Sequence, residues 1–155
     1  MTERLPEQRE RGWRAYIEAS LRLITRLEED LRPTGLSLAD YHVLVLLSEA
    51  PDRRLRMGEL ADRLVFSPSR LTYHISSMEK RGLVRRESCP QDRRGSHAVL
   101  TGHGLEVLRS AAPHHLDSVR RHFLDDLDDA EVAYLDRVFT RLGQRLRDSD
   151  RALAR

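Results

Sequence analysis

Cysteine is almost absent from this chain, because Cys89 is the only one among its 155 residues. A single cysteine excludes an intrachain disulfide and a cysteine cluster that binds metal. No apolar run approaches the roughly 18 residues that cross a bilayer, and the charged N-terminal segment has no apolar core of a secretory signal. These absences predict a cytoplasmic protein with no membrane partner.

Sequence patterns of common enzyme classes are also missing. The chain has no nucleophile elbow, no phosphate-binding loop, no HExxH and no paired-carboxylate pattern. Four aspartates cluster between Asp125 and Asp129, but a charged junction between helices explains them better than catalysis. We therefore predict that the protein is not an enzyme and has no catalytic residue and no cofactor.

Charge is unevenly distributed along the chain, although the formal net charge is only +2. Between residues 67 and 97, seven Arg and Lys stand against three Asp and Glu, so this segment carries +4 and the remainder carries −2. Positive charge concentrated in one module is typical of a phosphate-binding surface. An ordinary solvated face is the alternative, and charge alone favours that alternative.

The spacing of apolar residues predicts a mainly helical chain. Apolar side chains recur every three or four residues over Glu7–Leu31, which predicts a long first helix. Ser37 is a typical N-cap and predicts a second helix over Leu38–Glu49. A fifth helix of about two dozen residues is expected after Thr101, and a last helix over about Asp129–Arg147.

Two short helices joined by a tight turn are predicted in the middle of the chain. The first spans Gly58–Leu64. The second begins after Ser67, a capping residue, with Pro68 at the first helical position, where a missing N–H costs nothing. Gly82 ends this second helix. The order indicates a helix-turn-helix, which places its second helix in the major groove of DNA.

A basic two-stranded ribbon follows the helix pair. The predicted strands are Leu83–Ser88 and Ser96–Leu100, separated by a polar loop at Cys89–Gly95. Leu55–Met57 is a short extended segment that can pair with this ribbon as a third strand. A ribbon in this place is the wing of a winged helix-turn-helix, so we predict a helical DNA-binding lobe with a small β-ribbon.

The second helix of the motif carries most of the candidate DNA contacts. Because Leu71 and Ile75 face inward, the positions around them face outward to varying degrees. Arg70 is the best candidate for a bidentate contact with guanine, and serine hydroxyls at a helix N-terminus suit a phosphate. Simple solvent exposure is the alternative for each residue. The candidates on this helix are Ser67, Ser69, Arg70, Thr72, Tyr73, His74 and Ser76.

The polar loop of the wing supplies the remaining candidate DNA contacts. Arg93 and Arg94 are expected at the tip of the ribbon, where arginine is attracted into the minor groove. Asp92 is a poor neighbour for a phosphate. We expect its carboxylate to form an internal salt bridge that shapes the loop and holds one arginine while the other projects.

The wing motif resembles that of the MarR family of bacterial regulators. The resemblance rests on Asp92-x-Arg94, followed by Val99–Thr101 and Gly104, and on the preceding segment Met78–Arg86. It covers nearly the whole chain. It implies a helical dimer with a winged DNA-binding lobe, acting on a pseudo-palindromic operator and often released by a small aromatic acid. In that family the effector pocket lies between the dimer helices and the DNA-binding lobe.

We therefore expect a single domain over residues 1–155. Residues 37–100 are predicted to form the winged helix-turn-helix lobe, and residues 7–33 and 101–153 a helical dimerisation region. The terminal helices are more amphipathic than a compact monomer needs, which favours a homodimer over packing within one chain. The predicted function is a repressor that binds double-stranded DNA and is released by a small-molecule effector. An activator or a constitutive DNA binder stays open.

Candidates for the effector pocket are fewer. They are Trp13, Tyr16, His42 and Arg109, although Trp and Tyr at helical spacing more often belong to a core. Family members that sense urate carry an acidic residue early in the second helix, where this chain has His42. A zinc-sensing branch uses histidines of the second and fifth helices. This chain lacks two histidines one turn apart on the fifth helix, so no metal site is predicted.

Two alternatives to an effector-responsive repressor stay open. Cys89 beside the basic wing would make a redox-responsive regulator, because nearby positive charge stabilises a thiolate. Peroxide sensors of the family keep their reactive cysteine in the first helix, which has none here, so a partly buried strand-end thiol is favoured. The other alternative is a winged-helix module that binds proteins, which predicts loss of the wing arginines and acidic residues on the recognition helix.

Overall fold

The computed structural model describes residues 5–89 and 92–153, without the side chains at 89, 92–94, 151 and 153. The chain forms two compact units, Met1–Ser118 and Val119–Arg155. Within the described residues, no helix is both long enough and apolar enough to cross a membrane. The division of the chain predicted from the sequence, 37–100 against 7–33 and 101–153, stays a prediction.

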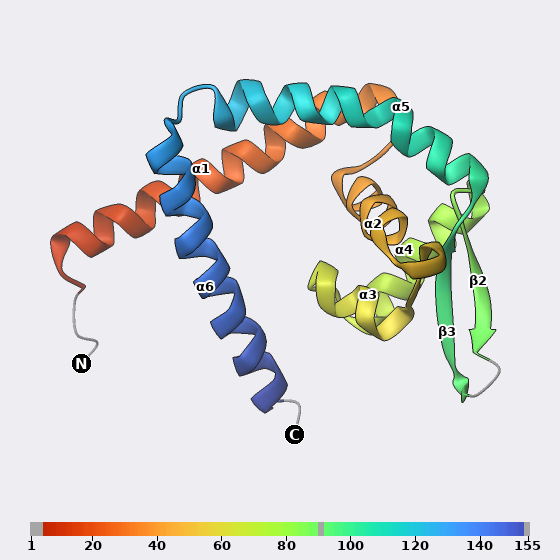
Figure 1. Cartoon of the computed structure of the whole chain (residues 1–155). Helices are drawn as coiled ribbons and strands as arrows, with labels where there is room; N and C mark the ends of the chain where they lie inside the picture. The colour runs from red at the N-terminus through yellow and green to blue at the C-terminus, as the bar shows by residue number, and fades with distance from the viewer. Residues whose placement is uncertain (1–4, 90–91, 154–155) are drawn as a thin grey trace. The chain divides into compact units, whose positions relative to one another are not determined.

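The first unit is mainly helical, as the sequence predicts (Figure 1). In chain order its elements are α1 (Glu7–Leu31), a 3-10 turn (Arg32–Thr34), α2 (Leu38–Glu49), a second 3-10 turn (Pro51–Arg53), β1 (Arg54–Arg56), α3 (Met57–Leu64), α4 (Pro68–Lys80), β2 (Val84–Cys89), β3 (Asp92–Leu100) and α5 (Gly102–Val119). The predicted bounds of α1 and α2 are confirmed.

The second unit consists of a π-helical turn, Arg120–Leu124, and α6, Asp129–Leu153. Because the π-helical turn directly continues α5, the helix of about two dozen residues predicted after Thr101 is confirmed, and the last helix is longer than predicted. The start of α6 is fixed by a reciprocal cap: Glu131 N–H donates to Asp128 Oδ1 (2.8 Å), and Asp128 N–H donates to Glu131 Oε2 (3.0 Å). Asp128, one of the four clustered aspartates, thus caps the start of α6.

The sheet is antiparallel, with strand order β1-β3-β2. Leu55 on β1 and Arg86 on β2 both pair with Ala98 on the central strand, so the predicted third strand is confirmed. The polar loop is shorter than the sequence predicts, because β3 begins at Asp92. A shift of register between Ser88 and Cys89 lets the two long strands continue their pairing into the segment expected to be loop.

The core of the first unit is built around α2, whose residues are buried on several sides. Three residues of α4 face this core and are at most 1% exposed: Leu71, Ile75 and Met78. Each fully buried side chain of this kind stabilises the fold by roughly 1.5–3 kcal/mol. Their spacing of three and four residues fixes which face of α4 is turned toward solvent.

The wing is joined to α5 by a close contact at Thr101 and Gly104. The Thr101 hydroxyl lies 2.6 Å from the carbonyl oxygen of Gly82 and accepts the Gly104 N–H at 2.9 Å, which caps α5 as predicted. A Cβ atom at Gly104 would lie only 2.0 Å from the carbonyl oxygen of Leu83. Glycine is therefore required at this position by the close approach of two backbone segments.

Candidate nucleic-acid interface

Helix α4 begins and ends with local signals that the sequence predicts correctly. The Ser67 hydroxyl accepts the backbone N–H of Arg70 at 3.2 Å, and Pro68 occupies the first helical position. Gly82, with φ of 72°, follows the end of the helix in the left-handed region. The helix is therefore fixed at both ends as well as along its buried face.

The turn between α3 and α4 contains a feature that the sequence analysis missed. Val65 adopts φ 56° and ψ 42°, a left-handed conformation that is uncommon for a β-branched residue, and its side chain is 83% exposed. Such backbone strain costs on the order of 1–3 kcal/mol. The next residue, Phe66, packs against the core and contacts two side chains of α4. The turn therefore places the aromatic ring of Phe66 against α4.

The outer face of α4 is polar and open to solvent. Tyr73 is 80% exposed, and Ser67, Ser69, Arg70 and Thr72 are exposed as well. These side chains come from one face of a helix that the core holds in position, so the structure brings most of the predicted contacts together. Their contact with DNA stays a prediction.

His74 and Ser76 are turned differently from the rest. The His74 side chain is only 20% exposed, because its Nε2 atom lies 3.1 Å from Asp40 Oδ1 on α2 and its ring meets Phe66 edge-on at 5.9 Å. The predicted outward orientation of His74 is therefore wrong, although its contact with DNA is untested. Ser76 is half-buried, and its hydroxyl accepts a hydrogen bond from Arg86 at 3.1 Å.

Asp40 joins α2 to the middle and to the C-terminal end of α4. This carboxylate is 5% exposed and lies 2.8 Å from Arg81 Nη1, at the end of α4, as well as close to His74. It also accepts the backbone N–H of Ser37 at 3.0 Å. Burial alone would raise the pKa of Asp40, but the nearby His74 ring and the hydrogen bonds from Arg81 and Ser37 outweigh burial and hold that pKa well below its usual range.

Several arginines of the basic segment have acidic partners inside the chain. Arg81 pairs with Asp40, Arg85 with Glu87 at 2.6 Å, and Arg86 with Glu79 at 3.2 Å. The last two pairs are solvent-exposed and therefore weak, so phosphate groups can compete for these arginines. Arg81 instead pairs with the buried carboxylate of Asp40, and this contact ties the end of α4 to α2.

The tip of the wing lies at the edge of the described part of the chain. Asp92, Arg93 and Arg94 begin β3, and Cys89 ends β2, but their side chains are outside the described set. The salt bridge predicted for Asp92, the minor-groove contacts predicted for the two arginines and the redox role of Cys89 stay predictions.

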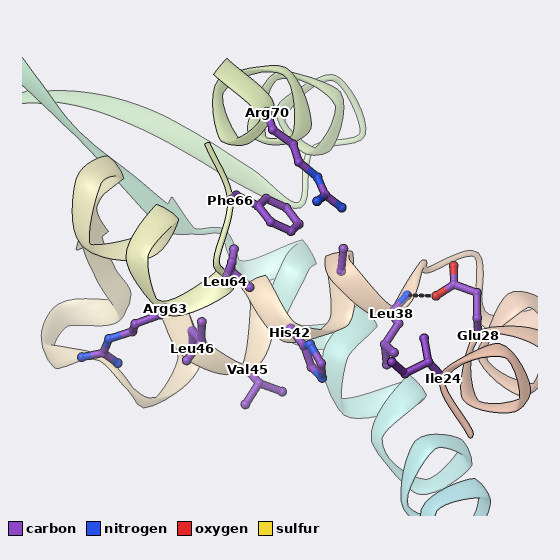
Figure 2. A pocket seen from close by; sticks show the side chains of 11 residues that line it. Ile24, Glu28, Leu38, His42, Val45, Leu46, Arg63, Leu64, Phe66 and Arg70 are labelled. Atoms are coloured by element: carbon purple, nitrogen blue, oxygen red, sulfur yellow. Dashed lines mark hydrogen bonds between the residues drawn. The ribbon is translucent and has the colours of Figure 1, made fainter. Parts of the chain in front are cut away.

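A cavity of about 490 Å³ lies between α1, α2 and the turn before α4 (Figure 2). Its lining comprises Ile24, Glu28, Leu38, Ala39, His42, Val45, Leu46, Arg63, Leu64, Phe66 and Arg70. Of the four predicted effector residues only His42 lines it. Trp13 and Tyr16 lie on α1 with 55% and 41% exposure and tilted rings 6.0 Å apart, and Arg109 is exposed on α5.

The histidines near α2 form a small aromatic cluster. The ring of His115 on α5 lies 4.2 Å from the ring of Tyr41. Burial lowers the pKa of His42, and burial together with the nearby His42 lowers the pKa of His115, so both favour the uncharged form. Among the described side chains, no group of three or more His, Cys, Asp or Glu is arranged to hold a metal ion.

The fold and the exposed α4 define a winged helix-turn-helix protein, and comparison with known proteins specifies its family. The family described as "MarR family" matches residues 34–95. AbsC, a MarR family transcriptional regulator from Streptomyces coelicolor, is 46% identical, with a TM-score of 0.90 over 95% of this chain and 99% of that one. Sco3205 from the same organism, crystallised with DNA, is 40% identical, with a TM-score of 0.90 over 94% and 92%.

Among curated relatives, the transcriptional regulator HosA of Escherichia coli O111:H- is 33% identical over 62% of this chain and 69% of its own length. MhqR, an HTH-type transcriptional regulator of Bacillus subtilis, is 25% identical over 76% and 79%. This chain belongs to the MarR family of transcriptional regulators.

Proposed function

We propose that this protein binds a specific double-stranded DNA operator through α4 and the β2–β3 wing. The observation that carries the proposal is the polar outer face of α4, with Arg70, Thr72 and Tyr73 exposed above a closely packed inner face. A helix held in this way can enter a major groove without rearranging its core. The DNA complex of Sco3205, a relative at 40% identity, supports the same mode here.

The operator is expected to be pseudo-palindromic, because we propose that the protein acts as a homodimer. Exposed apolar side chains on α1 support this proposal: Trp13 is 55% exposed, Leu21 62% and Ile24 53%. Helix α6 carries Tyr134 at 59% and Leu146 at 54%. Exposed apolar side chains that recur along a helix mark an interaction site, and a two-fold pair of recognition helices reads two half-sites about one helical turn apart.

We further propose that the protein represses transcription in the cytoplasm of a bacterial cell and responds to a small molecule. Two relatives are named repressors, YetL of Bacillus subtilis at 31% identity and MprA of Escherichia coli at 27%. The cavity beside α2 supports a small-molecule effector, since about 490 Å³ is within the usual range for a ligand pocket. Regulation of DNA binding requires no catalytic group, which agrees with a protein that is not an enzyme.

A gel-shift titration against the DNA upstream of its own gene tests the operator proposal. We expect tight binding at low salt that falls steeply as salt rises, because phosphate contacts release counterions. The control is a duplex of the same length and base composition in scrambled order. Failure to bind the upstream DNA, or equal affinity for both duplexes, contradicts sequence-specific binding.

The dimer is tested by placing a carboxylate in the apolar stripe of α1. Leu21→Glu is expected to convert a dimer into a monomer, measured as molar mass by light scattering during size-exclusion chromatography. Ala19→Glu is the matched control, because residue 19 is exposed on the opposite side of the same helix. A monomeric wild type, or equal masses for the two variants, contradicts an interface on this stripe.

A further inference from the structure

The recognition helix α4 and strand β2 of the wing are joined by one carboxylate. Glu79, in the last turn of α4, accepts the backbone N–H of Arg86 at 2.9 Å, and its other oxygen lies 3.2 Å from Arg86 Nε. Among the described strands β2 lies at an edge of the sheet, so an N–H on its outer side has no neighbouring strand to bind. Glu79 therefore binds the main chain of the wing as well as a side chain.

A second contact joins the same arginine to α4 about one turn earlier. Arg86 Nη2 donates to the hydroxyl oxygen of Ser76 at 3.1 Å. That hydroxyl has a single proton, which it donates to the carbonyl oxygen of Thr72 at 2.8 Å. Ser76 is therefore oriented to accept a hydrogen bond from Arg86 and has no proton left to donate to a phosphate. One planar guanidinium thus spans two neighbouring side chains of α4.

The neighbouring ion pair of the wing joins no second element. Arg85 donates to Glu87 at 2.6 Å, but both residues lie on β2, so this pair connects the strand only to itself. Arg86 instead connects the strand to a helix. The side chains of Arg86 and Glu79 are 37% and 36% exposed, so their ion pair adds little to the stability of the fold. What the pair determines is the position of β2 relative to α4.

We propose that Ser76, Glu79 and Arg86 are positioning residues that hold the wing in a fixed place beside α4, so that one duplex meets both. The inference rests on the proposed DNA-binding function and gives these residues a role other than contact with DNA. A fixed wing raises the affinity for the operator, because its contacts are then made without a further loss of conformational freedom. Non-specific binding depends mainly on the number of positive charges and gains little from a fixed wing.

The sign of the effect at Glu79 separates this role from simple electrostatics. Glu79→Gln removes a negative charge and leaves one acceptor oxygen, which cannot hold both groups of Arg86. Charge alone predicts that this variant binds every duplex more tightly. The positioning role predicts weaker operator binding, by about twofold or more, the lower limit of coupling within one hydrogen-bond network. Glu87→Gln is the matched control, because it removes the same charge from β2 without affecting α4, and it should leave operator binding unchanged or tighter.

The arginine is tested with its charge held constant. Arg86→Lys keeps the positive charge, but a single ammonium group cannot reproduce the fork that reaches both Glu79 and Ser76. Operator binding should weaken by about twofold or more. Combination with Glu79→Gln should add little further loss, because both changes release the same connection. Arg85→Lys is the matched control and should change operator binding little, since Arg85 is paired only within its own strand.

Gel-shift titrations measure the affinity of each variant for the operator duplex and for the scrambled duplex, and urea unfolding checks the fold. Weaker operator binding by folded Glu79→Gln and Arg86→Lys, with affinity for the scrambled duplex maintained, supports the inference. Tighter or unchanged operator binding by Glu79→Gln, equal effects of Arg86→Lys and Arg85→Lys, or equal losses on both duplexes overturns it. A wild type that does not distinguish the two duplexes contradicts the proposed function itself. A wild type that distinguishes them, with variants that bind equally well, contradicts this inference alone.

Discussion

Replacing Asp40 with asparagine is expected to destabilise the first unit, because this buried carboxylate joins α2 to the recognition helix. The substitution keeps the size of the side chain and removes its charge. It leaves Arg81 and His74 facing a neutral amide at distances of 2.8 and 3.1 Å. The cap of α2 also loses the charged acceptor of the Ser37 N–H.

The expected loss is about 2–3 kcal/mol in the free energy of unfolding. Breaking a fully buried ion pair costs about 3–5 kcal/mol, and we reduce this figure because the Arg81 side chain is 38% exposed. For a chain of this size, a loss of that order lowers the melting temperature by about 5–10 °C. The protein concentration must be held constant, because dimerisation makes the melting temperature depend on it.

The effect depends on pH with a defined sign. The pKa of Asp40 is lowered in the folded protein, whereas an unfolded chain has its ordinary value of about 3.9. The charged carboxylate therefore contributes its full stabilisation above about pH 5, and this stabilisation decreases as pH falls below the unfolded value. The difference between wild type and Asp40→Asn should shrink by about 1 kcal/mol between pH 7 and pH 3.

Urea unfolding of both proteins across this pH range measures the difference directly. Asp52→Asn is the matched control, since that carboxylate is 77% exposed and lies 3.4 Å from its partner Arg54. It should change the unfolding free energy by less than about 0.5 kcal/mol. A deficit for Asp40→Asn that is constant down to pH 3, or no larger than that of the control, would refute the reasoning.

Three further predictions concern the start of α5 and the operator contacts. Gly104→Ala should lower the free energy of unfolding by about 2–3 kcal/mol, because the new methyl group meets the Leu83 carbonyl. Gly102→Ala, where nothing lies within 4 Å of the added atom, should be nearly neutral in the same urea titration, and equal losses would contradict the close approach. Arg70→Ala should weaken operator binding by about 1–3 kcal/mol and relax one base position, measured with a set of single-base operator variants. Arg94→Ala should weaken binding evenly across those variants and reduce the salt slope by about one; an even loss for Arg70→Ala would contradict base reading.

The sequence predicts the helix bounds that are determined by residues close to one another in the chain. Ser37 and Ser67 cap α2 and α4 within three residues of themselves, and Gly82 stops α4, so these helix bounds are readable without the fold. The start of β3 is not readable in this way, because strand pairing depends on a register set across the ribbon. The inward turn of His74 likewise depends on Asp40, which comes from another helix.

The cavity also could not be predicted from local sequence signals. Its lining comes from α1, α2 and the turn before α4, so no single segment reveals it. The sequence predicts His42 as a pocket residue through the resemblance to the MarR family. Phe66 was missed, since an aromatic residue between two helices usually indicates core packing. The cation–π contact with Arg70 appears only when the left-handed turn at Val65 is known.

The contact between Gly104 and the Leu83 carbonyl also bears on how relatives should be compared. Thr101 and Gly104 are part of the motif on which the resemblance to the MarR family rests, and both are constrained by the protein's own backbone. The DNA sequence that a relative binds is therefore not needed to explain either residue. Two proteins that share this signature can therefore regulate unrelated genes. Shared targets are better sought by matching the solvent-facing positions of α4, such as Ser69 and Tyr73, than by matching the motif that identifies the fold.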